Sequence, residues 1–156
     1  MVSHIQHRND HFNEVSMQRL TPKGRISETK LRVRYAETDA MGIVHHSSYV
    51  PWFELGRSDW LREAGLPYSE FEQMGYYLTV TEVCARYYHP AVYDEVVTVH
   101  TWVEEVRSRA VTLSYDIRNE QGKRLVMACT KHVCITHAGA PARLPDKLYK
   151  VLEQAS

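Results

Sequence analysis

Residues 47–65 read SSYVPWFELGRSDWLREAG, and this segment carries the clearest helical pattern in the chain. Its large side chains recur at the 3.6-residue period and form an apolar stripe roughly 120° wide. The stripe consists of Tyr49, Trp52, Phe53, Gly56, Trp60 and Ala64. Ser47 or Ser48 suits the N-cap and Gly65 suits the C-terminal stop. The pattern predicts one buried amphipathic helix near residues 47–64.

Gly56 lies in the middle of the stripe. Glycine in a helix interior costs about 1 kcal/mol relative to alanine, so its presence needs a compensation. A close approach between the helix backbone and a sheet would provide one, because glycine has no Cβ to hold the two apart. We therefore expect the helix to pack directly on a sheet at Gly56.

Strand-like segments rich in Val, Thr and Tyr follow the helix, near residues 76–90, 94–106, 110–119 and 123–137. Upstream, Leu31, Val33 and Tyr35 alternate with polar or small residues, which indicates a first strand whose Tyr35 is either a core or a site residue. A 15-residue strand spans about 50 Å, but a chain of this length folds to a diameter of about 40 Å. The strands must therefore curve. The predicted class is α+β: an antiparallel sheet of about five strands wrapped around one central helix, with a short helix after Pro145.

The composition favours a soluble enzyme or small-ligand binder over a nucleic-acid or membrane protein. Nineteen basic and 19 acidic residues cancel, and no apolar run is long enough to cross a bilayer. The start of the chain lacks the apolar core of a signal peptide, and the three cysteines are odd in number, so we expect free thiols and a cytoplasmic location. Residues 1–28 are polar and end in a turn-like segment, and we expect them to form a flexible N-terminal extension before a single domain over residues 29–156.

The segment between the predicted first strand and the helix carries the most chemistry. Asp39 is a possible base or nucleophile, and Gly42 permits a tight turn. The first free N–H groups of the helix follow at about His46 and can polarise a carbonyl. A carboxylate beside such donors suits hydrolysis of an activated acyl group such as a thioester. The alternative is that Asp39 merely caps a turn, as Asp commonly does in loops.

The pattern Tyr-x-x-Thr-Asp-x-x-Gly-x-Val-x-His-x-x-Tyr over residues 35–49, followed by Trp52-Phe53-Glu54, resembles the 4-hydroxybenzoyl-CoA thioesterase family. These are hotdog-fold acyl-CoA thioesterases, and the most similar branch is the one encoded with the bacterial Tol–Pal system. The resemblance runs from about residue 30 to residue 136. It implies hydrolysis of an acyl-CoA to free acid and CoA, no cofactor beyond the CoA of the substrate, and a homo-oligomer, dimer or tetramer, with the active site between subunits.

The resemblance also implies roles for particular residues. Asp39 matches the catalytic Asp, as nucleophile or as general base for water, and these two roles stay open. His46 matches the histidine of the branch, with its backbone N–H as the donor to the carbonyl, and Tyr35 matches an active-site tyrosine. Arg107 and Arg109 fall where the family binds the phosphates of CoA, which suits forked guanidinium donors. The family would lead us to expect Ala at position 56 in place of Gly56.

Other functions remain as alternatives. A non-catalytic hotdog protein that binds or senses acyl-CoA would need neither Asp39 nor His46, and a hotdog dehydratase or hydratase would leave the thioester intact. Glu54 is a possible carboxylate on the helix, but it lies off the stripe and is expected to face solvent or another subunit. His4, His7 and His11 have helical metal-ligand spacing, yet no recognised zinc pattern completes it, so we expect no metal. The cysteines lack a motif that lowers a thiol pKa.

Overall fold

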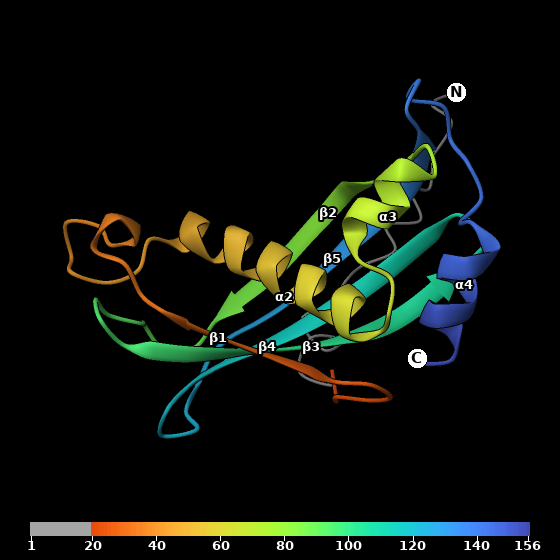
Figure 1. Ribbon diagram of the computed structural model, residues 1–156. Helices are drawn as coiled ribbons and strands as arrows, with labels where there is room; N and C mark the ends of the chain where they lie inside the picture. Colours follow the sequence, from red (N-terminus) through yellow and green to blue (C-terminus); the bar gives the residue numbers. More distant parts are fainter. Residues whose placement is uncertain (1–19) are drawn as a thin grey trace, which may run out of the picture.

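The computed structural model describes residues 20–156, which form a five-stranded antiparallel sheet in the order β1-β3-β4-β5-β2 (Figure 1). The strands are β1 (Ser27–Arg32), β2 (Tyr76–Tyr87), β3 (Val96–Arg107), β4 (Ala110–Asn119) and β5 (Arg124–Thr136). The helices are α2 (Tyr49–Glu63), α3 (Tyr68–Gln73) and α4 (Asp146–Glu153), with 3₁₀ turns at Tyr35–Glu37 and His46–Ser48. The predicted α+β class and the single central helix are confirmed.

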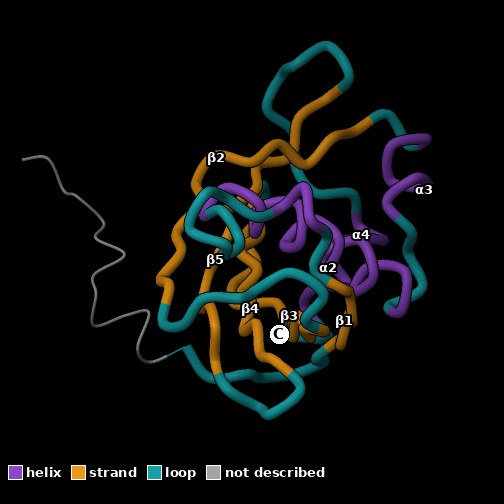
Figure 2. The backbone as a smooth tube through the Cα atoms, turned by 90° about the vertical axis from the view of Figure 1, so that its left-hand side faces the viewer, coloured by secondary structure: helices purple, strands orange, loops and turns teal. Residues whose placement is uncertain are grey.

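The sheet curves around α2, which lies along one of its faces (Figure 2). Register shifts between Val80 and Glu82 in β2, and between Val103 and Glu105 in β3, are bulges that bend the long strands. Both strands have 12 residues, so the expectation that strands of this length must curve is met. The predicted hairpin joins β4 to β5, and its Gly122 has a φ of 75°.

Gly56 is the point where α2 approaches the sheet most tightly. A Cβ built at this position would lie 2.5 Å from Thr101 Oγ1 and 3.0 Å from Val99 Cγ1, both on β3. Phe53 of α2 stacks on Tyr115 of β4, with ring centroids 4.9 Å apart. The close approach predicted from Gly56 is therefore present. It fixes α2 against the middle of the sheet and so fixes where its N-terminal end lies.

The first strand starts and ends earlier than predicted. β1 begins at Ser27 and ends at Arg32, so the chain has already left the sheet at Tyr35. Tyr35 lies instead in a 3₁₀ turn and is 77% exposed, so the interpretation of Tyr35 as a core residue is wrong. The N–H of Arg25 donates to the carbonyl of Ala155, 3.1 Å away, and ties the segment before β1 to the end of α4.

Both edges of the sheet consist of strands with one neighbour each. β1 pairs only with β3, and β2 pairs only with β5. The end of β2 at Tyr87 comes close to the start of α2, since the Tyr87 hydroxyl donates to the carbonyl of His46. The edge strand β2 therefore borders the segment that carries the sequence motif. Within residues 20–156, no helix has the length and apolar character needed to cross a membrane.

Candidate active site

The motif folds into a tight loop that holds Asp39 by its own backbone. The N–H of Asp39 donates to the carbonyl of Ile43 at 2.9 Å, and the N–H of Gly42 donates to the carbonyl of Asp39 at 3.0 Å. Gly42 has a φ of 76°, the left-handed conformation that its place in the motif requires. The N–H of Met41 donates to Asp39 Oδ1 at 2.8 Å, which is the turn-capping role weighed from the sequence. Only one carboxylate oxygen is used, so the cap and a chemical role are compatible.

Glu37 anchors this loop to α2. Its carboxylate accepts from the Arg34 N–H at 2.8 Å and from Trp52 Nε1 at 3.0 Å. Its backbone carbonyl accepts from the N–H of His45 and from the Ser48 hydroxyl. Burial alone raises the pKa of Glu37, but the hydrogen bonds from Arg34 and Trp52 and the Arg34 charge outweigh it, so the pKa is lowered. Glu37 is thus an ionised structural residue that fixes the position of Asp39 relative to the helix.

Asp39 and His46 line one cavity of about 290 Å³ at the N-terminal end of α2. The remaining lining is mostly apolar and aromatic and comes from the motif loop, α2 and the segment after β2: Met41, Ile43, Val44, Tyr49, Tyr87, Tyr88, His89 and Pro90. Tyr49 packs edge-on against Tyr87 with ring centroids 5.5 Å apart. Ligand sites typically combine apolar walls with a few placed polar groups, and this cavity has that composition.

The other three residues predicted for the site do not line this cavity. Tyr35 packs edge-on against Tyr93, with ring centroids 5.6 Å apart, on the exposed surface. The pairing registers across β3, β4, β5 and β2 place Arg107 at the same level of the sheet as Thr79. Thr79 is eight positions from Tyr87 along β2. At about 3.3 Å per residue this places Arg107 and Arg109 about 25 Å along the sheet from the Asp39 end. Within one chain, the two arginines predicted to bind phosphate and the Asp39 carboxylate are therefore far apart.

The aromatic wall of the cavity is not evident from the sequence. The strand predicted near residues 76–90 includes Tyr87, Tyr88, His89 and Pro90, but β2 ends at Tyr87. The N–H groups of Tyr88 and His89 still donate to the carbonyl of Leu125 in β5, although both residues lie beyond the strand. The Tyr-Tyr-His-Pro run before a break was the available indication, since proline interrupts a strand. Its position beside the motif depends on the pairing of β2 with β5 and could not be read from spacing.

A second group of polar residues lies under the middle of α2 and was also missed. Arg57 Nη1 donates to His132 Nδ1 at 2.8 Å, and His132 Nε2 lies 2.7 Å from Thr130 Oγ1. The Thr130 hydroxyl in turn lies 2.8 Å from the Tyr115 hydroxyl. Arg57 and His132 are 8% and 1% exposed. Burial, and then the adjacent Arg57 charge, lower the pKa of His132 to about 3, so His132 is neutral in the folded protein.

This neutral histidine predicts acid sensitivity. A histidine that titrates near 6.5 when unfolded and near 3 when folded favours the folded state above pH 6.5, and that stability is lost as the pH falls from about 6.5 towards 3. The free energy of unfolding is expected to fall by about 2–4 kcal/mol over this window. In His132→Asn the free energy of unfolding should be lower at pH 7 and should change less as the pH falls below 7. Urea unfolding between pH 7 and pH 4 measures this, with the exposed His137→Asn as the matched control; equal slopes in all three proteins would contradict it.

The remaining candidate chemistries find little support in residues 20–156. No group of three or more metal-ligating side chains occurs there, and His4, His7 and His11 lie outside the described residues. Burial raises the pKa of the Cys129 thiol to about 12, and burial also raises the pKa of Cys134, which disfavours a thiolate nucleophile. Glu54 is exposed on α2, as predicted.

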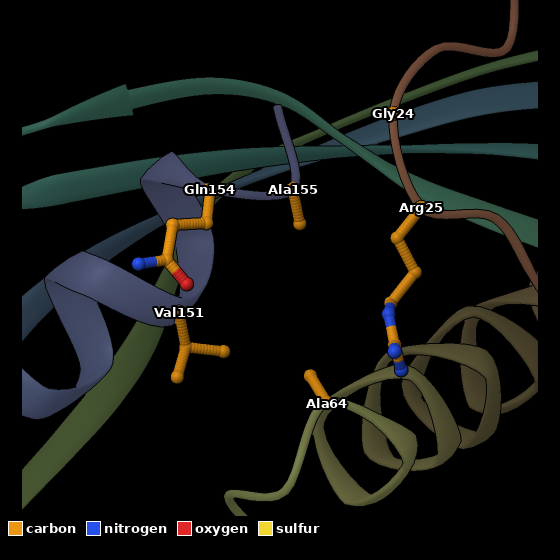
Figure 3. Close-up of a pocket in the computed structure, with 6 residues that line it drawn as sticks. All are labelled: Gly24, Arg25, Ala64, Val151, Gln154 and Ala155. Atoms are coloured by element: carbon orange, nitrogen blue, oxygen red, sulfur yellow. The ribbon is translucent and has the colours of Figure 1, made fainter.

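Another cavity, of about 310 Å³, lies between α4, the segment before β1 and the C-terminal end of α2 (Figure 3). Its lining residues are Gly24, Arg25, Ala64, Val151, Gln154 and Ala155. The Arg25 side chain runs to the end of α2, where Nη1 donates to the carbonyl of Glu63. This lining contains no carboxylate, histidine or thiol side chain, so it does not provide an acid or a base. The cavity with Asp39 and His46 is the better candidate for catalysis.

Comparisons with known proteins bear on the family of this chain. Residues 33–152 match the model of the thioesterase-like superfamily. The chain is 29% identical to the acyl-CoA thioester hydrolase YbgC of Escherichia coli, over 80% of this chain and 93% of that protein. A hypothetical protein from Thermus thermophilus superposes with a TM-score of 0.80 at 39% identity, covering 85% of this chain and 98% of that one. A DHNA-CoA thioesterase from Staphylococcus aureus superposes with a TM-score of 0.77 at 34% identity, covering 83% and 87%.

Proposed function

This chain belongs to the thioesterase-like superfamily and is an acyl-CoA thioesterase, and from this premise we propose that Asp39 and the N-terminal end of α2 carry out the hydrolysis. The observation that supports the assignment of residues is that Asp39 and His46 line one apolar cavity where helix N–H groups begin. His46 is the first residue of the 3₁₀ turn that leads into α2, directly after the N-cap His45, so by position its N–H has no partner within that turn. The hotdog fold predicted from the sequence is that of the superfamily.

In the proposed reaction the thioester carbonyl points its oxygen at the His46 N–H. The Asp39 carboxylate either removes a proton from water, whose oxygen attacks the carbonyl carbon, or attacks that carbon itself to form an anhydride that water then cleaves. In both routes the carbon–sulfur bond breaks, the thiolate of CoA leaves and takes up a proton, and the free acid remains. Charge develops on the carbonyl oxygen in each, where helix N–H donors stabilise it.

The CoA nucleotide is proposed to bind across two copies of the chain. Arg107 and Arg109 lie about 25 Å along the sheet from the Asp39 end of the same chain. Among the described residues, β2 pairs with β5 on one side and has no strand on its other side. Antiparallel pairing of two such β2 edges about a two-fold axis would reverse one sheet relative to the other. The arginine end of one copy would then lie beside the Asp39 end of the other. This arrangement supports the predicted homo-oligomer with a site between subunits.

The test is release of free thiol from a panel of acyl-CoAs with short, long and aromatic acyl groups. We expect turnover of at least one class, with the aromatic wall of Tyr49, Tyr87 and Tyr88 setting the preference. The panel also separates the alternatives. Binding of acyl-CoA without thiol release would replace the enzyme by an acyl-CoA sensing protein, and a change in the acyl group with the thioester intact would indicate a hydratase or dehydratase.

A further inference from the structure

A smaller cavity of about 50 Å³, which we call the second cavity, lies between the middle of α2 and the edge strand β2. It shares no lining residue with the Asp39 cavity, but its Val50 follows Tyr49 of that cavity along α2, and its Val83 lies four residues before Tyr87 on β2. Its exposed rim consists of three valines, Val50 on α2 and Val80 and Val83 on β2, together with the carboxylate side chain of Glu54 on α2. Its deeper lining contains the buried chain of Arg57, His132, Thr130 and Tyr115. An apolar groove that ends in buried polar groups suits an elongated ligand with a polar tip.

The hydrogen bonds among these four side chains leave one donor without an acceptor. Arg57 only donates, so His132 accepts at Nδ1 and carries its proton on Nε2, which donates to Thr130 Oγ1. Thr130 and Tyr115 then share a single hydrogen bond, which uses one of their two hydroxyl hydrogens. The other hydroxyl hydrogen has no acceptor among the described residues.

Arg57 adds a second unpaired donor and an uncompensated charge. Arg57 is 8% exposed, and its Nε has no hydrogen-bond partner within residues 20–156. No acidic side chain among residues 20–156 forms an ion pair with it; its guanidinium lies over the Tyr68 ring, 5.4 Å from the centroid. Glu54 also lines the cavity but makes no ion pair with Arg57. A buried cation and two free donors are costly without an acceptor, so the cavity is suited to an anion.

We propose that this second cavity binds a carboxylate at the far end of the acyl chain, so that the preferred substrates are acyl-CoAs with a terminal carboxylate. The inference rests on the proposed function for the position of the thioester. The eight helical steps from Tyr49 to Arg57 span about 12 Å, which is the length the acyl chain must bridge. A volume of 50 Å³ is several times that needed for one water and accommodates a carboxylate. The apolar rim contacts the methylene chain between the two ends.

The experiment measures binding, by calorimetry, of CoA thioethers that cannot be hydrolysed. Matched pairs of equal chain length end in a carboxylate or in a methyl group, and the series increases in length. At the length that reaches Arg57, the wild-type protein should bind the carboxylate member about 10- to 100-fold more tightly, the range of a charge-assisted hydrogen bond. Arg57→Met should reduce this ratio to about 3-fold or less, while Arg62→Met, an exposed arginine on the same helix, should leave it unchanged.

Val50→Glu provides a variant that leaves the buried hydrogen-bonded residues and the β2 edge unchanged, in case Arg57→Met fails to fold. Val50 is exposed at the rim on α2, and a like charge there should weaken binding of the carboxylate member selectively. Equal binding of both members by the wild-type protein, or a preference that survives in the folded variants, would overturn the inference. Because thioethers report binding without turnover, a carboxylate preference in a protein that releases no thiol would contradict the proposed function and leave this inference standing.

Discussion

Asp39→Asn is expected to lower kcat for thioester hydrolysis by about 10²-fold or more, because an amide is neither a base nor an effective nucleophile. The change is expected to leave the loop intact. Asn retains the Oδ1 atom that accepts the Met41 N–H at 2.8 Å, and the backbone bonds of Asp39 to Ile43 and Gly42 do not involve the side chain. Thiol release under saturating acyl-CoA measures kcat directly, and thermal unfolding of the variant checks the fold.

The comparison needs a carboxylate variant outside the site. Glu120 lies in the exposed hairpin between β4 and β5, and Glu120→Gln replaces a carboxylate by an amide, as Asp39→Asn does. The kcat of this variant should equal that of the wild-type protein. KM for Asp39→Asn should change much less than kcat, since the carboxylate acts on the reacting carbon and not on the CoA moiety. An Asn variant that retains full kcat would remove Asp39 from the mechanism and leave it as a turn cap only.

Most of the fold could be predicted from local patterns. The apolar stripe predicted α2, Gly56 predicted its close approach to the sheet, and Asn119–Gly122 predicted the hairpin, because each depends on residues within a few positions of one another. Tyr35 shows the limit of such reasoning. Its alternation with Leu31 and Val33 favoured a strand, but Glu37 bonds to the Arg34 N–H and to Trp52, fifteen residues on, and the chain forms a turn there.

The candidate site also has a part that local sequence patterns predict and a part that they do not. Asp39 and His46 lie in one short motif, and the structure brings them to one cavity. The pair Arg57 and His132 is 75 residues apart, and each alone has an ordinary interpretation, as an exposed helix arginine or a strand histidine. Their contact exists because the curved sheet brings His132 of β5 against α2 at Arg57, which no pattern within either segment specifies. Long-range packing, not residue type, creates the buried cation.

Gly56→Ala is the substitution with the largest expected effect on stability. It is expected to destabilise the protein, although helix propensity alone favours alanine over glycine. In an exposed helix this change would stabilise by about 1 kcal/mol. Here the new Cβ would meet Thr101 Oγ1 at 2.5 Å, on a fully buried and β-branched side chain that cannot swing away. We expect a net loss of about 1–3 kcal/mol in the free energy of unfolding, the usual cost of overpacking a core. Urea unfolding at pH 7 measures it.

Thr101→Ala should relieve this strain, because it removes the atom that the new Cβ meets. Thr101 Oγ1 is buried without a hydrogen-bond partner, so its loss breaks no hydrogen bond. The double variant Gly56→Ala/Thr101→Ala should therefore be more stable than the sum of the two single changes predicts, by about 1 kcal/mol or more. Additive effects, or a Gly56→Ala protein more stable than the wild type, would show that α2 can move away from β3 at no cost. The position of the α2 N-terminal end, and with it the Asp39 cavity, would then not depend on Gly56.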